Sequence, residues 1–148
     1  MKSLTDTVTY KYTFTAKNAV TEFSGIKLYK LPWADAFNYL EYFTIEKRNF
    51  PFNVWELTSA ESEVETMTIE IPKGKVLAEQ PKPLSVSCSA ADYSLTYKVS
   101  PTKVVITRTF KVKKDVVPTA EYVQLKDFFT KVVEADAKQF GFKNAAVQ

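Results

Sequence analysis

The sequence predicts a mainly β protein: an antiparallel β-sandwich-like domain with one long C-terminal amphipathic α-helix packed on the sheet. Two observations favour this fold class. Apolar and polar residues alternate along most of the chain before Pro118, which is typical of strands that bury one face. Beyond Pro118 the apolar residues recur at helical spacing. We therefore expect strands over about residues 6–113, a helix over about residues 119–139, and a single domain spanning residues 1–148.

Four strands are expected in the first half of the chain. Residues 7–15 carry Thr or Lys at odd positions and apolar side chains at the even positions Val8, Tyr10, Tyr12 and Phe14. Residues 26–31, between a glycine and a proline, predict a second strand. Residues 50–57 and 64–71 predict two more, separated by a polar loop, and the last of these places Met67, Ile69 and Ile71 on one face.

The clearest strand patterns lie between residues 84 and 113. Apolar residues alternate with serines over residues 84–90, and residues 93–99 repeat the pattern with Ser, Thr and Lys, which indicates a hairpin or two adjacent strands. Residues 103–113 place Val104, Ile106, Phe110 and Val112 on one face, with Arg108 among them. Such short strands at regular spacing favour an antiparallel sandwich or a strongly curved sheet.

The helix has recognisable end signals. Thr119 follows a proline and is expected to be its N-cap, with Glu121 in the first turn, and Gly141 is expected to stop it. The apolar stripe comprises Tyr122, Leu125, Phe128, Phe129, Val132, Val133 and Ala135. Residues 32–43 fit either a short helix or an ordered aromatic loop, because their apolar spacing is helical but the stretch is short.

Composition excludes several classes of site. The chain has no histidine and one cysteine, so a Ser-His-Asp or Cys-His site, a histidine zinc site, an internal disulfide and a Cys₄ site are all ruled out within it. The net charge is +3 with only two arginines, and lysines alternate with other residues, which does not favour nucleic-acid binding. No apolar run is long enough to span a bilayer, and the N-terminus lacks the apolar core of a signal peptide. We expect no catalytic residue, cofactor, metal or membrane insertion.

Three polar features are interpreted as structural. Cys88 lies on an apolar strand face and is expected to pack as a small hydrophobic residue. Arg108 interrupts an apolar face, so we expect it to pair with a carboxylate or with backbone carbonyls, because a buried unpaired charge is costly. Glu61, Glu63 and Glu65 point to one side, which a solvated strand face explains.

Aromatic residues make up 14% of the chain and are the candidates for binding. Trp33, Trp55, Tyr39 and Tyr42 are the candidate ligand or interaction surface, either as a stacking platform for sugars or as the lining of an apolar cavity. Core packing explains the same residues, because aromatics are also favoured in strands and cores.

The order of motifs in the second half resembles a known domain family. The segments that carry the resemblance are Arg48–Phe52, Thr68–Gly74, Pro81, Tyr93, the strand containing Arg108, Pro118–Tyr122 and Gln139–Lys143. This order is similar to that of the C-terminal β-rich domain that follows a transglutaminase-like core in large exported proteins of Bacteroidetes. The resemblance covers about residues 45–143, with weaker agreement back to Thr7.

The resemblance implies a non-catalytic accessory or interaction domain whose partner is a transglutaminase-like core of the same polypeptide. In that family the catalytic residues lie in the core, so none is assigned here. It also implies a periplasmic or cell-surface setting, and it leaves open whether the chain is a fragment of a larger protein. It does not specify an oligomeric state.

Two other functions fit the sequence. The first is a small hydrophobic-ligand binder with an α+β helix-grip fold, in which Tyr10, Tyr12, Tyr97 and Phe128 line an enclosed cavity. The second is a carbohydrate-binding module, which requires Trp33 or Trp55 to be flat and exposed.

Overall fold

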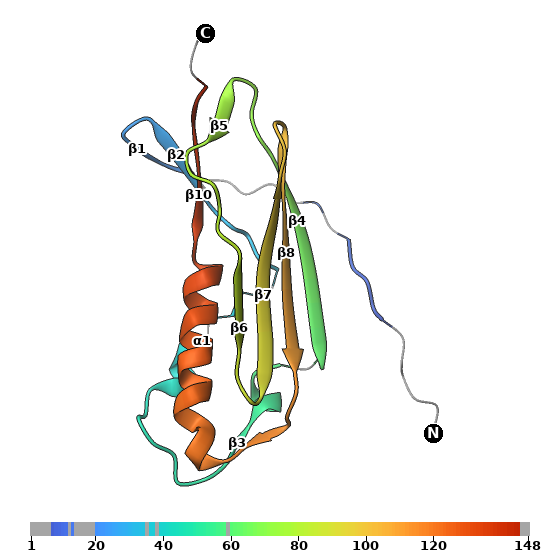
Figure 1. The fold of residues 1–148 in the computed structure, drawn as a ribbon, viewed down its shortest axis with the longest axis vertical. Coiled ribbons are helices and arrows are strands. Elements are labelled where there is room, and N and C mark those ends of the chain that lie inside the picture. Colours follow the sequence, from blue (N-terminus) through green and yellow to red (C-terminus); the bar gives the residue numbers. More distant parts are fainter. Residues whose placement is uncertain are drawn as a thin grey trace.

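The computed structural model shows a mainly β fold with antiparallel sheets and one α-helix near the C-terminus, which confirms the predicted fold class (Figure 1). The residues that it describes are 7–11, 13, 20–34, 36–37, 39–58 and 60–145. Every strand pair among them is antiparallel.

The larger sheet has four strands in the order β4-β8-β7-β6. They are β4 (Ser62–Glu70), β6 (Leu84–Ser87), β7 (Ala91–Val99) and β8 (Lys103–Val112). Burial alternates along these strands, so one face of the sheet meets the core and the other is turned to solvent. β6 and β7 pair as the hairpin that the alternation over residues 84–99 favoured.

A second sheet has the order β1-β2-β10-β5. Its strands are β1 (Val20–Phe23), β2 (Ile26–Lys30), β5 (Lys75–Leu77) and β10 (Gln139–Asn144). Ser24 and Gly25 have φ of 51° and 77° and form the two-residue turn between β1 and β2, a turn type that needs positive φ. A third sheet joins β3 (Phe52–Asn53) to β9 (Val116–Val117).

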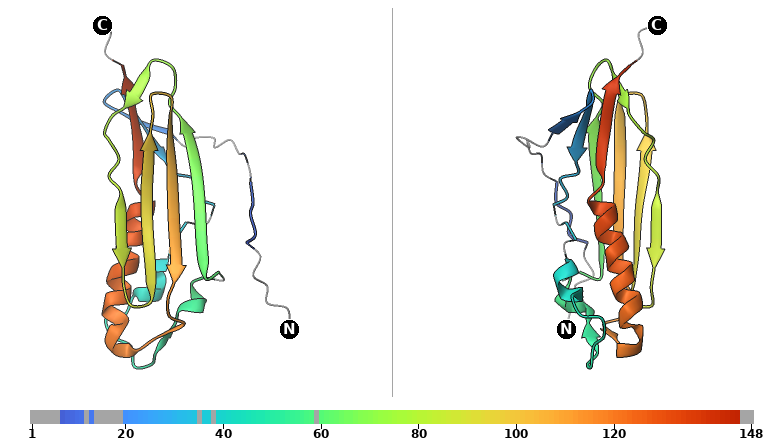
Figure 2. Two further views of the ribbon diagram at one scale, coloured as in Figure 1. Left: turned by 45° about the vertical axis from the view of Figure 1, so that its right-hand side comes forward. Right: turned by 90° about the vertical axis from the view of Figure 1, so that its left-hand side faces the viewer.

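The helix and the second sheet cover the same face of the larger sheet. Figures 1 and 2 show α1 (Tyr122–Asp136) lying along one half of that face, while β10, which follows it directly, runs along the other half with β2 and β5. The two layers enclose the core. α1 is preceded by a short 3₁₀ helix at Thr119–Glu121.

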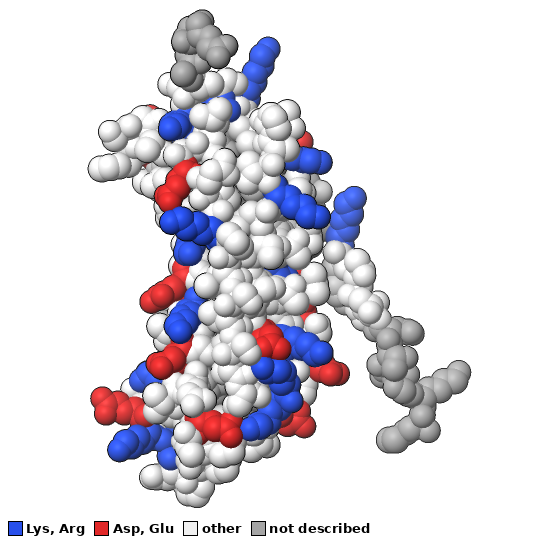
Figure 3. Space-filling view, in the orientation of Figure 1, with Lys and Arg blue, Asp and Glu red and all other residues white. Residues whose placement is uncertain are grey.

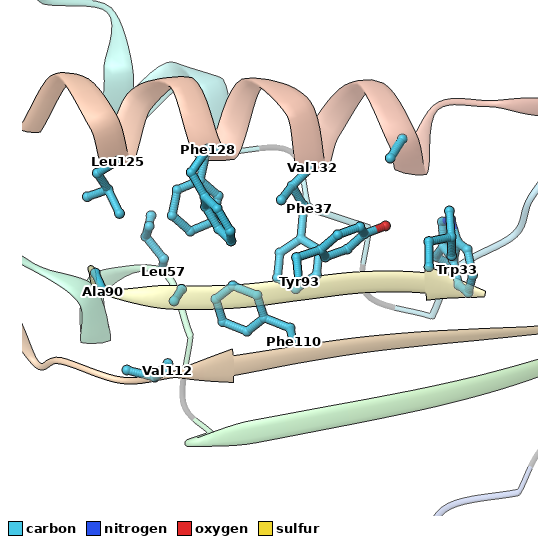
Figure 4. Close-up of a cluster of buried hydrophobic side chains, with 14 of the residues drawn as sticks. Trp33, Phe37, Leu57, Ala90, Tyr93, Phe110, Val112, Leu125, Phe128 and Val132 are labelled. Carbon is cyan, nitrogen blue, oxygen red and sulfur yellow. The ribbon is translucent and has the colours of Figure 1, made fainter. Parts of the chain in front are cut away.

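Aromatic rings fill the space between α1 and the larger sheet. Figure 4 shows Phe128 and Val132 of α1 pointing toward Phe110 and Tyr93 on the strands, with Phe37 inserted from the loop after β2. The ring centroid of Phe110 lies 4.9 Å from that of Phe37 and 6.4 Å from that of Phe128. Contacts at these separations are typical of a close-packed aromatic core.

Two strand predictions in the first half are wrong. Residues 7–11 and 13 are exposed and form no strand, and the other residues of the predicted 7–15 strand lie outside the described part of the chain. In place of one strand over residues 50–57, β3 has two residues and a 3₁₀ helix follows at Val54–Glu56. Asn53 explains the break, because its Oδ1 accepts a hydrogen bond from the backbone N–H of Trp55 and caps the turn.

The helical segment begins at Thr119 as predicted, but its first three residues form a 3₁₀ turn and α1 itself begins at Tyr122. Thr119 is not the N-cap, because Pro118 takes that position. The predicted C-terminal end is wrong. α1 stops at Asp136, and Gly141 lies inside β10. A Cβ at Gly141 would lie 3.1 Å from side-chain atoms of Ile26 and Ala78, so this glycine permits close packing on β10 instead of stopping the helix.

The ambiguous segment at residues 32–43 combines both expected structures. Residues 31–34 and 36–37 are loop, and a 3₁₀ helix follows at Tyr39–Phe43. Trp33, Phe37 and Phe43 are buried. The stretch therefore serves as an aromatic loop that packs against the larger sheet and α1.

Candidate functional site

A buried ionic cluster lies where α1 ends against the larger sheet. Arg108 on β8 is only 3% exposed. Its Nη1 lies 2.6 Å from Oδ2 of Asp136, and its Nη2 lies 2.9 Å from Oε2 of Glu65. Pairing with a carboxylate was one of the two arrangements expected for Arg108. We use the name ionic cluster for Arg108, Glu65, Asp136 and Tyr93.

Strand register and helix length bring these groups together. Glu65 on β4 is directly opposite Arg108 on β8, and Leu95 on β7 is opposite Arg108 on the other side. Asp136 is the last residue of α1. A carboxylate there faces the negative end of the helix dipole, so the guanidinium compensates both the side chain and the helix terminus.

Tyr93 completes the cluster from β7. Its hydroxyl donates a hydrogen bond of 2.5 Å to Oδ1 of Asp136. Burial raises the pKa of Tyr93 strongly, and the hydrogen bond and charge of Asp136 raise this pKa further. Burial and the charge of Asp136 also raise the pKa of Tyr97. Tyr93 is therefore held in its protonated, hydrogen-bond-donating form.

The loop after β2 closes over the cluster. The guanidinium carbon lies 4.6 Å from the ring centroid of Trp33 and 4.7 Å from that of Phe37, so it makes a cation–π contact with each ring. Backbone N–H groups of the loop donate to the carboxylates: Ala34 to Oε1 of Glu65 at 3.1 Å, and Phe37 to Oδ2 of Asp136 at 3.5 Å. The indole N–H of Trp33 donates to the carbonyl of Asp136 at 3.3 Å.

The arrangement favours a structural role for the ionic cluster. Among the described residues, every buried side-chain nitrogen and oxygen has a hydrogen-bond partner. The two carboxylates are occupied by the guanidinium, the tyrosine hydroxyl and loop amides, and they join α1, β4, β7, β8 and the loop. Buried ion pairs of this kind favour one arrangement of the chain more than they add net stability. No group of three or more His, Cys, Asp or Glu residues suited to a metal ion occurs in the described part of the chain.

Sequence reasoning identified Arg108 but not its partners. Asp136 follows Val132 by one helical turn, which places it on the apolar stripe. An acidic residue on the buried face of a helix is the signal that could have identified it. Glu63 and Glu65 lie half-buried on the inward face of β4, so a solvated strand face is wrong for them. Glu63 accepts a hydrogen bond of 2.8 Å from Thr58.

Cys88 follows β6 and is half-buried. Its backbone N–H donates to the carbonyl of Ala91 at 2.9 Å, and its side chain packs against the core. The thiol forms no disulfide. This environment supports the expected role of Cys88 as a small packing residue.

The structure separates the aromatic residues that the sequence grouped as one surface. Trp33 is buried beside Arg108, whereas Trp55 and Tyr42 are 40% and 41% exposed. The side chain of Tyr39 lies outside the described part of the structure. Trp33 therefore belongs to the core, which leaves Trp55 and Tyr42 as the exposed members.

Six exposed apolar side chains lie on segments that meet at the end of the molecule where α1 begins. We call this set the apolar end; its members are Tyr42, Ile45, Phe50, Trp55, Val116 and Val123. Pairing of β3 with β9 and a hydrogen bond of 3.2 Å from Tyr122 to the carbonyl of Ile45 hold their segments together. Figure 1 shows these segments meeting at the start of the helix.

Two of the residues proposed for a helix-grip cavity, Tyr10 and Phe128, lie in different environments. Tyr10 is 83% exposed, whereas Phe128 is 3% exposed and packs against Phe110 and Phe129. Tyr12 lies outside the described residues. The filled interface between α1 and the sheet does not favour the cavity-type ligand binder.

Charged groups of both signs occupy the surface. Figure 3 shows lysine and arginine side chains beside acidic ones over the face that carries α1. Within the described residues, no helix combines the length and apolar character needed to cross a membrane.

Fold and site together define a β-rich domain closed by a C-terminal helix that an internal ion-pair cluster holds in place. The chain belongs to a family of domains of unknown function, DUF3858, whose model matches residues 26–142. The fold is similar to part of a solved structure described as a "putative protease" from Parabacteroides distasonis, with a TM-score of 0.62 and 19% sequence identity. The match covers 80% of this chain and 23% of the other, so this fold is a small part of that protein. Among curated proteins, none matches this chain.

Proposed function

We propose that the chain is a non-catalytic accessory domain that packs against a neighbouring domain of the same polypeptide. The observation that carries the proposal is the coverage of the structural match, because a similar fold makes up only 23% of a much longer solved chain. Domains joined in one chain commonly bury a modest, partly apolar interface. The resemblance in the sequence further suggests that the neighbour is a transglutaminase-like core, in a periplasmic or cell-surface protein.

The apolar end supports this proposal as the surface of contact. Phe50 is 77% exposed, and Val116 and Val123 are each about half exposed. Exposed apolar side chains on neighbouring segments are typical of interaction sites when they form a contiguous patch. A neighbouring domain that covers them would remove them from water.

The ionic cluster supports a non-catalytic role. Its carboxylates are already committed to Arg108 and to loop amides. General acid–base catalysis needs a carboxyl group that can reach a substrate. We assign these groups to holding the helix, strands and loop in one arrangement.

Reassembly of the domain with its neighbour tests the proposal. An antibody against residues 20–145 should detect a native polypeptide far heavier than 16.8 kDa in fractionated cells, in the periplasmic or surface fraction. Isothermal titration of the rest of that polypeptide with this chain should show binding. Phe50→Ala with Trp55→Ala should weaken it about tenfold or more, since buried aromatic anchors dominate such interfaces.

A matched control is Phe23→Ala, which removes an equally exposed ring (73%) from the turn between β1 and β2. It should leave the affinity unchanged. A native polypeptide of 16.8 kDa, or equal affinity for the apolar-end variant and the unmodified chain, would overturn the proposal.

A further inference from the structure

The two edges of the larger sheet differ. The β6 edge has four residues, and Pro81 and Pro83 precede it. The β4 edge has nine residues without a proline, and in the described part of the chain β4 pairs with β8 alone. Backbone groups of alternate β4 residues therefore point away from the sheet, which is the surface that an added strand recognises.

A segment of the same chain lies beside this edge. Tyr10, Lys11 and Thr13 line a groove of about 590 Å³ together with β4 residues 64–69 and with residues of β1, β2 and the loop after β2. Figures 1 and 2 show residues 7–11 running along the open side of β4. One wall of the groove is thus a stretch of the N-terminal chain that lies beside the open edge of the larger sheet.

The polarity of the segment matches the two faces of β4. Thr66 and Thr68 lie on the exposed face of β4, whereas Met67 and Ile69 lie half-buried on the inward face. The segment alternates in the same way, with Thr or Lys at odd positions and apolar residues at even ones. In register as a strand, it would extend the threonine-rich outer face and turn its apolar side chains inward.

The apolar side chains of the segment gain most from such pairing. Val8 is 69% exposed and Tyr10 is 83% exposed. Apolar residues at alternate positions are typical of a half-buried strand, and here their side chains are exposed to water beside an open strand edge. The length also fits. A strand over residues 7–13 would span about 23 Å, which is shorter than the nine-residue β4.

We propose that the open edge of β4 is a strand-docking site whose occupant is the chain's own segment beginning at Thr7. Docking makes the larger sheet five-stranded and covers the inward side of β4. The inference is independent of the proposed accessory role, because it concerns only contacts within this chain.

Disulfide trapping in the full chain tests the pairing. In a Cys88→Ser background, Lys11→Cys is combined in turn with Val64→Cys, Thr66→Cys and Thr68→Cys, whose side chains share the outer face of the docked sheet. A pair bridges only when its Cα atoms lie within about 7 Å. One of the three should oxidise roughly tenfold faster than Lys11→Cys with Met67→Cys, which points to the opposite face.

A second measurement requires no engineered cysteine. Val8→Asp with Tyr10→Asp should lower the hydrogen-exchange protection of β4 amides roughly tenfold, whereas Thr7→Asp with Thr9→Asp on the outer face should lower it less. Fast monomeric trapping in one outer-face pair supports the proposal. Equal oxidation of all pairs, crosslinked dimers only, or unchanged exchange in the Val8 and Tyr10 variant would each overturn it.

Discussion

Replacing Arg108 by methionine should destabilise the domain severely. The substitution keeps the apolar stem but removes the charge that faces Asp136 at 2.6 Å and Glu65 at 2.9 Å. The side chain of Asp136 is 4% exposed and that of Glu65 is 20% exposed, so one carboxylate remains deeply buried without its cation. Removing one partner of a buried ion pair costs about 3–5 kcal/mol.

The loss should be visible in both chemical and thermal unfolding. For a chain of this length, 1 kcal/mol corresponds to about 2–4 °C in Tm, so Arg108→Met should lower Tm by roughly 6–20 °C. Urea titration followed by tryptophan fluorescence reports the same change, because Trp33 packs on the guanidinium. Arg48→Met is the control, since Arg48 lies over the Phe52 ring without a carboxylate pair among the described contacts.

A double-mutant cycle separates charge from packing. Among the described carboxylates, Asp136→Leu alone leaves Glu65 paired with Arg108, whereas Arg108→Met with Asp136→Leu removes both members of the closer pair. The double variant should be more stable than the sum of the two single losses predicts, by about 1–3 kcal/mol. A loss below about 1 kcal/mol for Arg108→Met, or strictly additive losses, would refute the coupling argued for the cluster.

Three further outcomes follow from the structure. Burial raises the pKa of Tyr93, so just above pH 10 only the unfolded state loses the phenol proton. The free energy of unfolding measured by urea titration should therefore fall as the pH rises above 10. Tyr93→Phe should make this fall shallower by about 1.4 kcal/mol per pH unit. In thermal unfolding, Gly141→Ala should lower the stability by about 1–3 kcal/mol, because the added Cβ crowds Ile26 and Ala78. Gly25→Ala should lower it by about 1–2 kcal/mol, because Gly25 has a positive φ. A variant as stable as the unmodified protein would contradict the cause stated for it. Acrylamide should quench the fluorescence of Trp55 more than that of Trp33, because Trp55 is the more exposed. Trp55→Phe should therefore leave a fluorescence, from Trp33, that acrylamide quenches less. Quenching equal to that of the unmodified protein would contradict the assigned burial.

Local pattern was sufficient where an element buries one face along its whole length. β8 alternates cleanly, and its inward positions were all identified from residue type, including Arg108. In β7 the pattern identified Tyr93 and Leu95 but missed the buried Ala91. The stripe of α1 was found for the same reason, because a 3.6-residue period is set by the helix itself.

Prediction failed where the partner decides the conformation. The end of α1 and the start of β10 depend on β2 and β5, which offer Gln139–Asn144 two neighbouring strands. Gly141 was predicted from the sequence to stop the helix, but in the structure it lies in β10 and permits close packing. Residues 7–11 show the converse, since they carry a strand pattern but form no strand in this structure and are exposed.

The sequence by itself determined the fold class, the inward face of each long strand, the apolar stripe of the helix and the need to neutralise Arg108. These follow from side-chain period and from the cost of burying an unpaired charge. Only the tertiary structure decided that Asp136, Glu65 and Tyr93 meet at that arginine and that Trp33 belongs to the core. Contacts between residues far apart in the sequence, such as the Trp33 indole on the Asp136 carbonyl 103 positions away, depend on how the layers stack, which no local pattern encodes.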